Sequence, residues 1–198
     1  MGLSIHYNGQ LRNPECLPTF VEEVRDIAKI YQWPYTIFET EFPLQSWGKN
    51  THGNGLYGIS FTPPGCETIS LSFLSNGKLV SIWSWRLFLK RMGEEEQILE
   101  GGVSVKTQYA GEVIHKIIIH FLDHLSKKYF SHFSMTDEGQ YWETRDEKLL
   151  HKNFNLLTGL INAFQDTLET NPINRGETFE EYFKRILEKI HAQNKFTE

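Results

Sequence analysis

The chain has few cysteines. Its 198 residues include two, Cys16 and Cys66. Two cysteines can form at most one disulfide, and they cannot supply a four-thiolate zinc site. The opening residues, MGLSIHYNG, also lack the basic start and apolar run of a secretory signal. We therefore expect both cysteines to be free thiols in a reducing compartment.

The chain also lacks an excess of positive charge and a long hydrophobic run. It carries 20 basic and 25 acidic residues, a net charge of −5. A protein that coats nucleic acid needs a basic surface, so we expect no nucleic-acid partner. Every apolar stretch is far shorter than the roughly 20 residues that span a bilayer. We therefore expect a soluble, cytoplasmic protein that does not associate with a membrane.

What remains is an ordinary globular composition, 39% hydrophobic and 23% charged. The length suits a single domain of residues 1–198. Within it, the patterning predicts a sheet-rich part, 1–144, with two helices, followed by a C-terminal helical pair at 145–194. Helices are expected near 19–32, 111–130, 145–168 and 178–192.

Polar and apolar residues alternate in the segments between these helices, as in half-buried strands. Two helix starts carry a capping box, Thr19 with Glu22 and Thr178 with Glu181. The pattern predicts an α+β fold in which helices pack on one face of a mainly antiparallel sheet of five to eight strands. Because many unrelated functions share this outline, it implies no activity.

One hairpin is predicted in detail. Asn76-Gly77 suits a two-residue type I′ turn, because both residues tolerate positive φ. Pairing outward from that turn sets Phe73 opposite Val80 and Leu71 opposite Ile82. This register gathers the apolar residues on one face.

Two segments share a faint similarity. LSIHYNG, a helix and PYTIFET resemble VSVKTQYAG, a helix and FSMTDEGQYWET. The similarity is consistent with a duplicated strand–helix–strand unit. Chance is the alternative, since this rhythm is common and the shared letters are few.

A pair of histidines is the first candidate for chemistry. His120 and His124 lie four positions apart on an expected helix, so both imidazoles can reach one metal ion. A third ligand would come from His132, Asp137 or Glu143. The general-base glutamate of H-E-x-x-H is missing, because Phe121 follows His120. The alternative is that both histidines are ordinary boundary residues.

An acidic hairpin, 137–147, is the second candidate. It places five carboxylates beside Tyr141 and Trp142, and carboxylates beside aromatic rings can serve as an acid/base pair. The simpler interpretation is turn chemistry at Asp137 and a favourable helix dipole for the acids that follow.

The loop 42–56 is the third candidate. It is long and rich in glycine, and it contains Trp47 and His52. Loops of this length in small domains are often functional, and tryptophan anchors interfaces well. A self-packed loop with Trp47 in the core is the alternative.

A basic–aromatic cluster is interpreted as structural. Three glutamates follow it directly, which argues against nucleic-acid binding. The cluster comprises Trp83, Trp85, Arg86, Lys90 and Arg91.

These observations favour a non-enzymatic binding or interaction module whose partner, a protein or a small ligand, is unknown. Its contact surface would use the loop and the hairpin edge, and no cofactor is predicted. A metal- or carboxylate-dependent hydrolase centred on His120, His124 and the hairpin 137–147 is the alternative. A homodimer formed through the last helix is a further option. The residues expected at the contact surface are Trp47, His52, Tyr141, Trp142 and Glu143.

Overall fold

A computed structural model describes residues 2–43, 45, 47, 55–91 and 96–194. The chain divides into two compact units, Met1–His151 and Lys152–Glu198. This division lies close to the boundary predicted between the sheet-rich part and the helical pair. The elements are β1 (Ser4–Leu11), α1 (Cys16–Ile30), β2 (Tyr35–Ile37), β3 (Tyr57–Phe61), β4 (Ile69–Phe73), β5 (Leu79–Val80), α2 (Ile82–Lys90), η1 (Glu96–Leu99), β6 (Val103–Lys106), η2 (Gln108–Ala110), α3 (Gly111–Tyr129), β7 (Phe130–Asp137), α4 (Tyr141–Thr144), α5 (Glu147–Thr170) and α6 (Phe179–Asn194).

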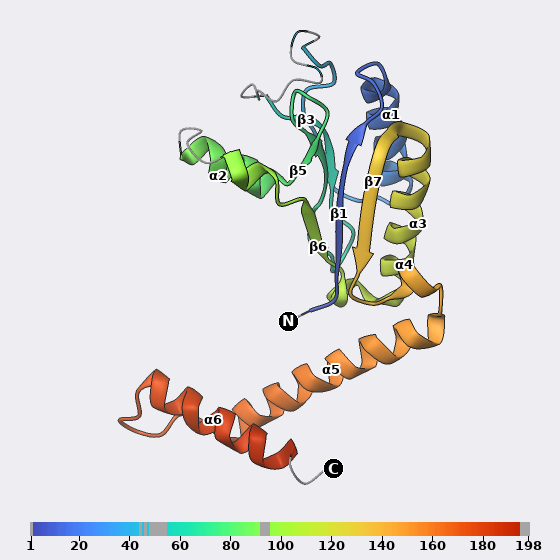
Figure 1. Ribbon diagram of the computed structural model, residues 1–198. Coiled ribbons are helices and arrows are strands. Elements are labelled where there is room, and N and C mark those ends of the chain that lie inside the picture. Colours follow the sequence, from blue (N-terminus) through green and yellow to red (C-terminus); the bar gives the residue numbers. More distant parts are fainter. Residues whose placement is uncertain (1, 44, 46, 48–54, 92–95, 195–198) are drawn as a thin grey trace. The chain divides into compact units, whose positions relative to one another are not determined.

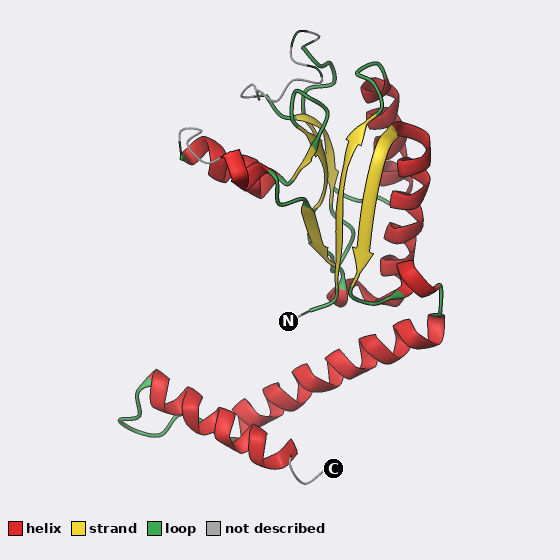
Figure 2. Ribbon diagram, in the orientation of Figure 1, coloured by secondary structure: helices red, strands yellow, loops and turns green. Residues whose placement is uncertain are grey.

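The first unit contains two antiparallel sheets. One has the strand order β6-β1-β7 and the other β2-β3-β4-β5. Hydrogen bonds join the two sheets: the Leu11 amide donates to the Gly77 carbonyl and the Glu67 amide to the Lys106 carbonyl, each over 3.0 Å, and the Tyr7 hydroxyl donates to the Ser70 carbonyl over 2.9 Å. The predicted α+β class is confirmed, and the strands and helices lie as Figures 1 and 2 show.

Helices α1 and α3 cover one face of these sheets (Figure 1). Apolar residues recur along α1 at helical spacing, so one side of the helix is buried. Phe20 on that side makes edge contacts with Phe73 of β4, at 5.4 Å between ring centroids, and with Tyr129 of α3, at 5.3 Å. Each fully buried side chain of this size contributes about 2 kcal/mol through the hydrophobic effect.

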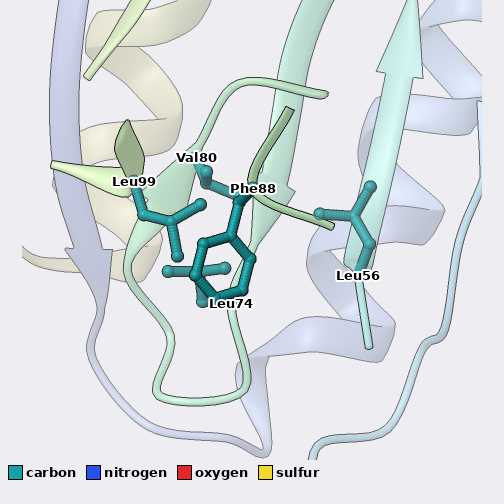
Figure 3. Close-up of a cluster of buried hydrophobic side chains, with 5 residues drawn as sticks. All are labelled: Leu56, Leu74, Val80, Phe88 and Leu99. Carbon is teal, nitrogen blue, oxygen red and sulfur yellow. The ribbon is translucent and has the colours of Figure 1, made fainter. Parts of the chain in front are cut away.

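Helix α2 packs on the opposite face. The Ser81 hydroxyl caps its start by accepting a hydrogen bond from the Ser84 amide at 2.9 Å. Near its end, Phe88 inserts into a small apolar cluster (Figure 3). The cluster therefore anchors α2 to the sheet. The other cluster members are Leu56, Leu74, Val80 and Leu99.

The hairpin between β4 and β5 exists, but its predicted register was wrong by one residue. Val80 pairs with Ser72 instead of Phe73. Only Gly77 has positive φ in this turn, at +82°, so a three-residue loop replaces the type I′ turn. Both residues of β5 are buried. Hydrophobic sorting therefore cannot select one register.

The hairpin predicted at 137–147 does not form. Strand β7 ends at Asp137, and the chain turns into the short helix α4. The Asp137 carboxylate explains this, because its Oδ2 accepts from the amides of Tyr141 at 2.7 Å and Trp142 at 3.1 Å. A capped helical turn therefore replaces the returning strand.

The strand–helix–strand order does occur twice, as β1-α1-β2 and β6-α3-β7. The two copies pair differently. Strands β6 and β7 flank β1 within one sheet, whereas β1 and β2 belong to different sheets.

One predicted capping box is confirmed and one is wrong. The Glu181 amide donates to the Thr178 hydroxyl, and the Glu181 carboxylate accepts from the Thr178 amide at 2.9 Å. Helix α1 instead begins at Cys16, whose amide donates to the Asn13 side chain at 3.0 Å. The Thr19 pattern therefore lies inside the helix.

The second unit contains most of α5 and all of α6. Phe164 and Phe183 join the two helices edge to face, at 6.4 Å between ring centroids. Leu160, Phe179 and Leu187 have exposed side chains. The homodimer predicted through the last helix stays a prediction. Among the described residues, no helix is both long enough and apolar enough to cross a membrane.

Candidate functional site

A cleft of about 730 Å³ lies between α2 and the uncovered face of the sheets. Its floor comes from β2, β3, β4 and β6, and α2 forms its roof. Most of the lining side chains are short and polar. The described lining residues are Thr36, Phe38, Ser60, Glu67, Thr68, Ser70, Ser81, Ile82, Trp83, Ser84, Arg86, Gly101, Gly102 and Ser104.

A row of hydroxyl groups crosses the floor. Thr36 pairs with Ser60, and Ser60 pairs with Ser70, so the three side chains stand side by side on adjacent strands. Ser60 and Ser70 are only 4% and 5% exposed. Strand alternation explains the row, because Ile59, Phe61 and Leu71 face the helix-covered core and the serines face away.

The hydroxyls of Ser60 and Ser70 have no hydrogen-bond partner in the described part of the chain. The two residues are only slightly exposed, but their oxygens are not among the described buried side-chain atoms that lack a partner, so they open into the cleft. Ser72, the next residue on the same face of β4, behaves differently, because its hydroxyl donates to the Val80 carbonyl over 2.7 Å. The hydroxyls of Ser60 and Ser70 are therefore available to a polar group that enters the cleft.

Two residues of α2, Trp83 and Arg86, provide an aromatic ring and a cation at the roof of the cleft. The side of α2 that carries Trp85 and Phe88 packs on the apolar cluster. Trp83 and Arg86, three positions apart on another side of the helix, line the cleft. Trp83 is 77% exposed. No ion pair involves Arg86 among the residues that the structure describes.

The cleft ends at Gly101 and Gly102. Gly102 has φ +68°, and a Cβ there would lie 3.2 Å from the Tyr7 carbonyl oxygen, so a glycine suits both its conformation and its surroundings. The Glu67 carboxylate is already engaged, because it accepts from the Lys106 amide at 2.8 Å. A smaller cavity of about 230 Å³ shares both glycines and continues over β1 and β7.

The residues predicted in the long loop are only partly described. The Trp47 ring lies 5.0 Å from that of Phe42. It also covers Gly77, where an added Cβ would lie 2.4 Å from the indole. Trp47 is therefore packed against the β4–β5 turn. His52 lies outside the described residues.

The residues predicted at the hairpin edge lie instead around α4. Tyr141 is buried, and its hydroxyl lies 3.1 Å from His120 Nε2. The Arg145 guanidinium lies over the Trp142 ring at 4.5 Å. Glu143 accepts from the Asp137 amide at 2.9 Å. Each of the three already has a partner within the fold, and a contact surface here stays a prediction.

The two candidate metal ligands have different neighbours. His124 Nε2 lies 2.7 Å from the Glu23 carboxylate, whereas His120 faces Tyr141. Within the described ranges, no three histidine, cysteine, aspartate or glutamate side chains are grouped as a metal ion requires. The hydrolase alternative therefore gains no third ligand from this geometry. Cys16 and Cys66 are both free, and burial raises the pKa of the Cys66 thiol to about 12.

A buried polar network at the end of β7 was not predicted. His115 Nε2 lies 3.0 Å from Asp137 Oδ1, and His115 Nδ1 lies 2.6 Å from the Thr107 hydroxyl. The three residues are fully or almost fully buried. Burial raises the pKa of Asp137, but the hydrogen bond and charge of His115 and two backbone amides outweigh it, so the net pKa is lowered.

This network joins a threonine, a histidine and an aspartate, as catalytic triads do, but its position gives it another role. No solvent-exposed hydroxyl belongs to it, because Thr107 and His115 are 0% exposed. Instead it joins the start of α3 to the turn after β7. We interpret it as structural.

The sequence did contain signals of the cleft. Serine alternates with buried apolar residues in both GISFT and TISLSF. Trp83 and Arg86 also stood out as a cluster. The sequence alone did not predict that the two segments pair or that α2 lies above them.

The chain matches no known protein family, and comparisons with curated proteins and with solved structures also find no match.

Proposed function

We propose that the protein is a binding protein that takes a small polar molecule into the cleft between α2 and the sheets. The observation that carries this proposal is the pair of serines, Ser60 and Ser70, whose hydroxyls open into the cleft without a partner in the described chain. A polar ligand would supply the hydrogen bonds that the fold does not.

The size and lining of the cleft agree with this proposal. Its volume of about 730 Å³ lies within the usual range for small-molecule sites. The floor belongs to paired strands, and α2 is held by Phe88 in its apolar cluster. A preformed site of this kind loses little entropy when a ligand binds.

Binding is favoured over acid–base catalysis by the state of the carboxylate in the cleft. Among the described lining residues, Glu67 alone carries a carboxylate. Its oxygen already accepts from the Lys106 amide. The proposal keeps the non-enzymatic class that the sequence favours but moves the contact surface away from Trp47 and Trp142.

The proposal is tested by measuring which backbone amides respond when candidate ligands are added. Isotope-labelled full-length protein is titrated with glucose, glucose 6-phosphate, glucuronate and inorganic phosphate, and the backbone amide signals are recorded. We expect at least one of these polar probes to shift the signals of Ser60, Ser70 and Gly102 together. The double variant Ser60→Ala/Ser70→Ala should weaken that binding at least tenfold.

The matched control is Ser126→Ala. Ser126 lies on α3, on the covered side of the sheets, and its hydroxyl donates to the Asp123 carbonyl. This variant should leave binding unchanged. If none of the four probes shifts cleft signals, or if the double variant binds them as tightly as the unmodified protein, the proposal is wrong.

A further inference from the structure

We infer that the ligand of this cleft is a sugar-sized acid, with its phosphate or carboxylate group at Arg86 and its hydroxyl groups along the row Thr36–Ser60–Ser70. This inference rests on the proposed function and adds the chemical class of the ligand. It is drawn from three features of the cleft: a cation without a described ion-pair partner, an exposed indole ring and a row of hydroxyl groups.

The cation is Arg86. Its guanidinium is a cation that presents five donors in a planar fork. No described carboxylate forms an ion pair with it, while the carboxylate in the cleft, Glu67, is held by the Lys106 amide. A phosphate or carboxylate matches the fork with two parallel hydrogen bonds, which are stronger than bonds to a neutral group.

The indole is Trp83, one helical turn before Arg86 on α2. Its side chain lines the cleft and is 77% exposed. Exposing a large aromatic ring to water is unfavourable, and a tryptophan left open at the rim of a cleft provides a flat apolar surface. The C–H face of a sugar ring fits against such a surface.

The floor offers hydroxyl groups at regular spacing. Adjacent strands lie about 4.8 Å apart, so Thr36, Ser60 and Ser70 form a row in which each hydroxyl can reach a different oxygen of one ligand. Each can donate and accept one or more hydrogen bonds. Together with Arg86, they make the cleft rich in donors, and oxygen-rich acids accept them.

The test compares each acid with its neutral parent by isothermal titration calorimetry at fixed salt. The probes are glucose, glucose 6-phosphate, glucuronate and inorganic phosphate. We expect the phosphorylated or the carboxylated sugar to bind at least tenfold more tightly than glucose and than inorganic phosphate alone. The better of the two acids identifies the group that Arg86 binds.

Variants of α2 test whether Arg86 is the residue that binds the acidic group of the ligand. Arg86→Gln should abolish the preference for the acid and leave binding of the neutral parent within twofold. Lys90→Gln is the matched control, because Lys90 is also an exposed cation of α2 but does not line the cleft. It should keep the preference. Trp83→Ala should weaken binding of both the sugar and its acid by a similar factor.

The outcomes separate the two proposals. If glucose shifts the cleft signals and the acids bind no better, the inference is wrong and the proposed function stands. If the acids bind better but Arg86→Gln keeps that preference, the inference is also wrong. If no probe reaches the cleft, both fail.

Discussion

The polar residues at the end of β7 differ from those on the floor of the cleft in how many of their polar atoms have a partner within the fold. At the end of β7, every oxygen of the Asp137 carboxylate has a partner. On the floor of the cleft, the hydroxyls of Ser60 and Ser70 have none among the described residues. The first arrangement holds the fold together, and the second leaves hydrogen-bonding capacity for a ligand.

The difference follows from what surrounds each group. Asp137 sits where a strand, a turn and a helix meet, so backbone amides of Gly139, Tyr141 and Trp142 converge on it. Ser60 and Ser70 sit mid-strand, where neighbouring amides and carbonyls are already used in the sheet. Their hydroxyls instead open into the cleft, where a ligand can reach them.

Removing Asp137 should have the largest effect. Asp137→Ala leaves two buried amides, one partly buried amide and the His115 ring without their acceptor, and losing one partner of a buried pair costs about 3 kcal/mol or more. Urea unfolding followed by circular dichroism measures the loss. Glu138→Ala is the control, because that carboxylate is exposed, and equal losses in the two variants would contradict the structural role of the network.

Acidification tests a third polar group, at the surface between α1 and α3. Glu23 accepts from Lys128 at 2.8 Å and from Tyr129 at 2.5 Å. Burial raises its pKa, but hydrogen bonds from Lys128, Tyr129 and His124 outweigh it and lower the pKa from 4.5 to about 2. Because the folded-state pKa is the lower one, this stabilisation is present above pH 4.5 and lost as the pH falls towards 2.

The variant Glu23→Gln should therefore lose on the order of 1 kcal/mol at neutral pH, since the carboxylate is partly open to solvent. Its stability should also fall less steeply than that of the unmodified protein between pH 4.5 and pH 2.5, a window within the range of the pKa shift. Urea midpoints across this range give both results. Parallel pH profiles for the two proteins would show that Glu23 makes no such contribution.

Ser72→Ala should cost about 1 kcal/mol. Unlike the Ser70 hydroxyl, the Ser72 hydroxyl has a partner, because it donates to the Val80 carbonyl. One such hydrogen bond contributes about 1 kcal/mol to stability. The measurement is the same urea unfolding experiment. A variant as stable as the unmodified protein would place Ser72 with the cleft serines instead.

Ser70→Ala should change stability by less than about 0.5 kcal/mol, because it removes a hydroxyl that has no described partner. Ligand binding should weaken in the same variant. A loss as large as that of Ser72→Ala would mean that Ser70 serves the fold, and would remove the main support for the proposed site.

Much of the fold could be predicted because its signals are local. Apolar residues at helical spacing marked α1, α3, α5 and α6, and the Thr178–Glu181 box marked a helix start that the structure confirms. Two local signals were misread because a competing side chain nearby decides. Asn13 accepts from the Cys16 amide at the start of α1, before the Thr19 pattern begins, and the Asp137 carboxylate turns the expected hairpin into α4.

The candidate site could be predicted only as separate pieces. The alternating serines of β3 and β4 and the pair Trp83 and Arg86 are visible in the sequence. The serines and the two α2 residues face one cleft because Phe88 holds α2 above the strands. Phe88 does so by packing among residues distant in the chain. The aromatic residues predicted to form a contact surface pack against the fold instead: Trp47 lies against Phe42, and Tyr141 is buried.

By itself, the sequence determined the α+β class and the positions of the main helices, because periodic burial of apolar side chains specifies each element locally. The tertiary structure alone decided the register of β5, the turn after β7 and the cleft. Strand β2 of the second sheet is exposed, whereas β3, β4 and β5 are buried. Both residues of β5 are apolar and buried, so polarity along the chain does not fix its register. Only the packing of α2 leaves two serines facing an open space.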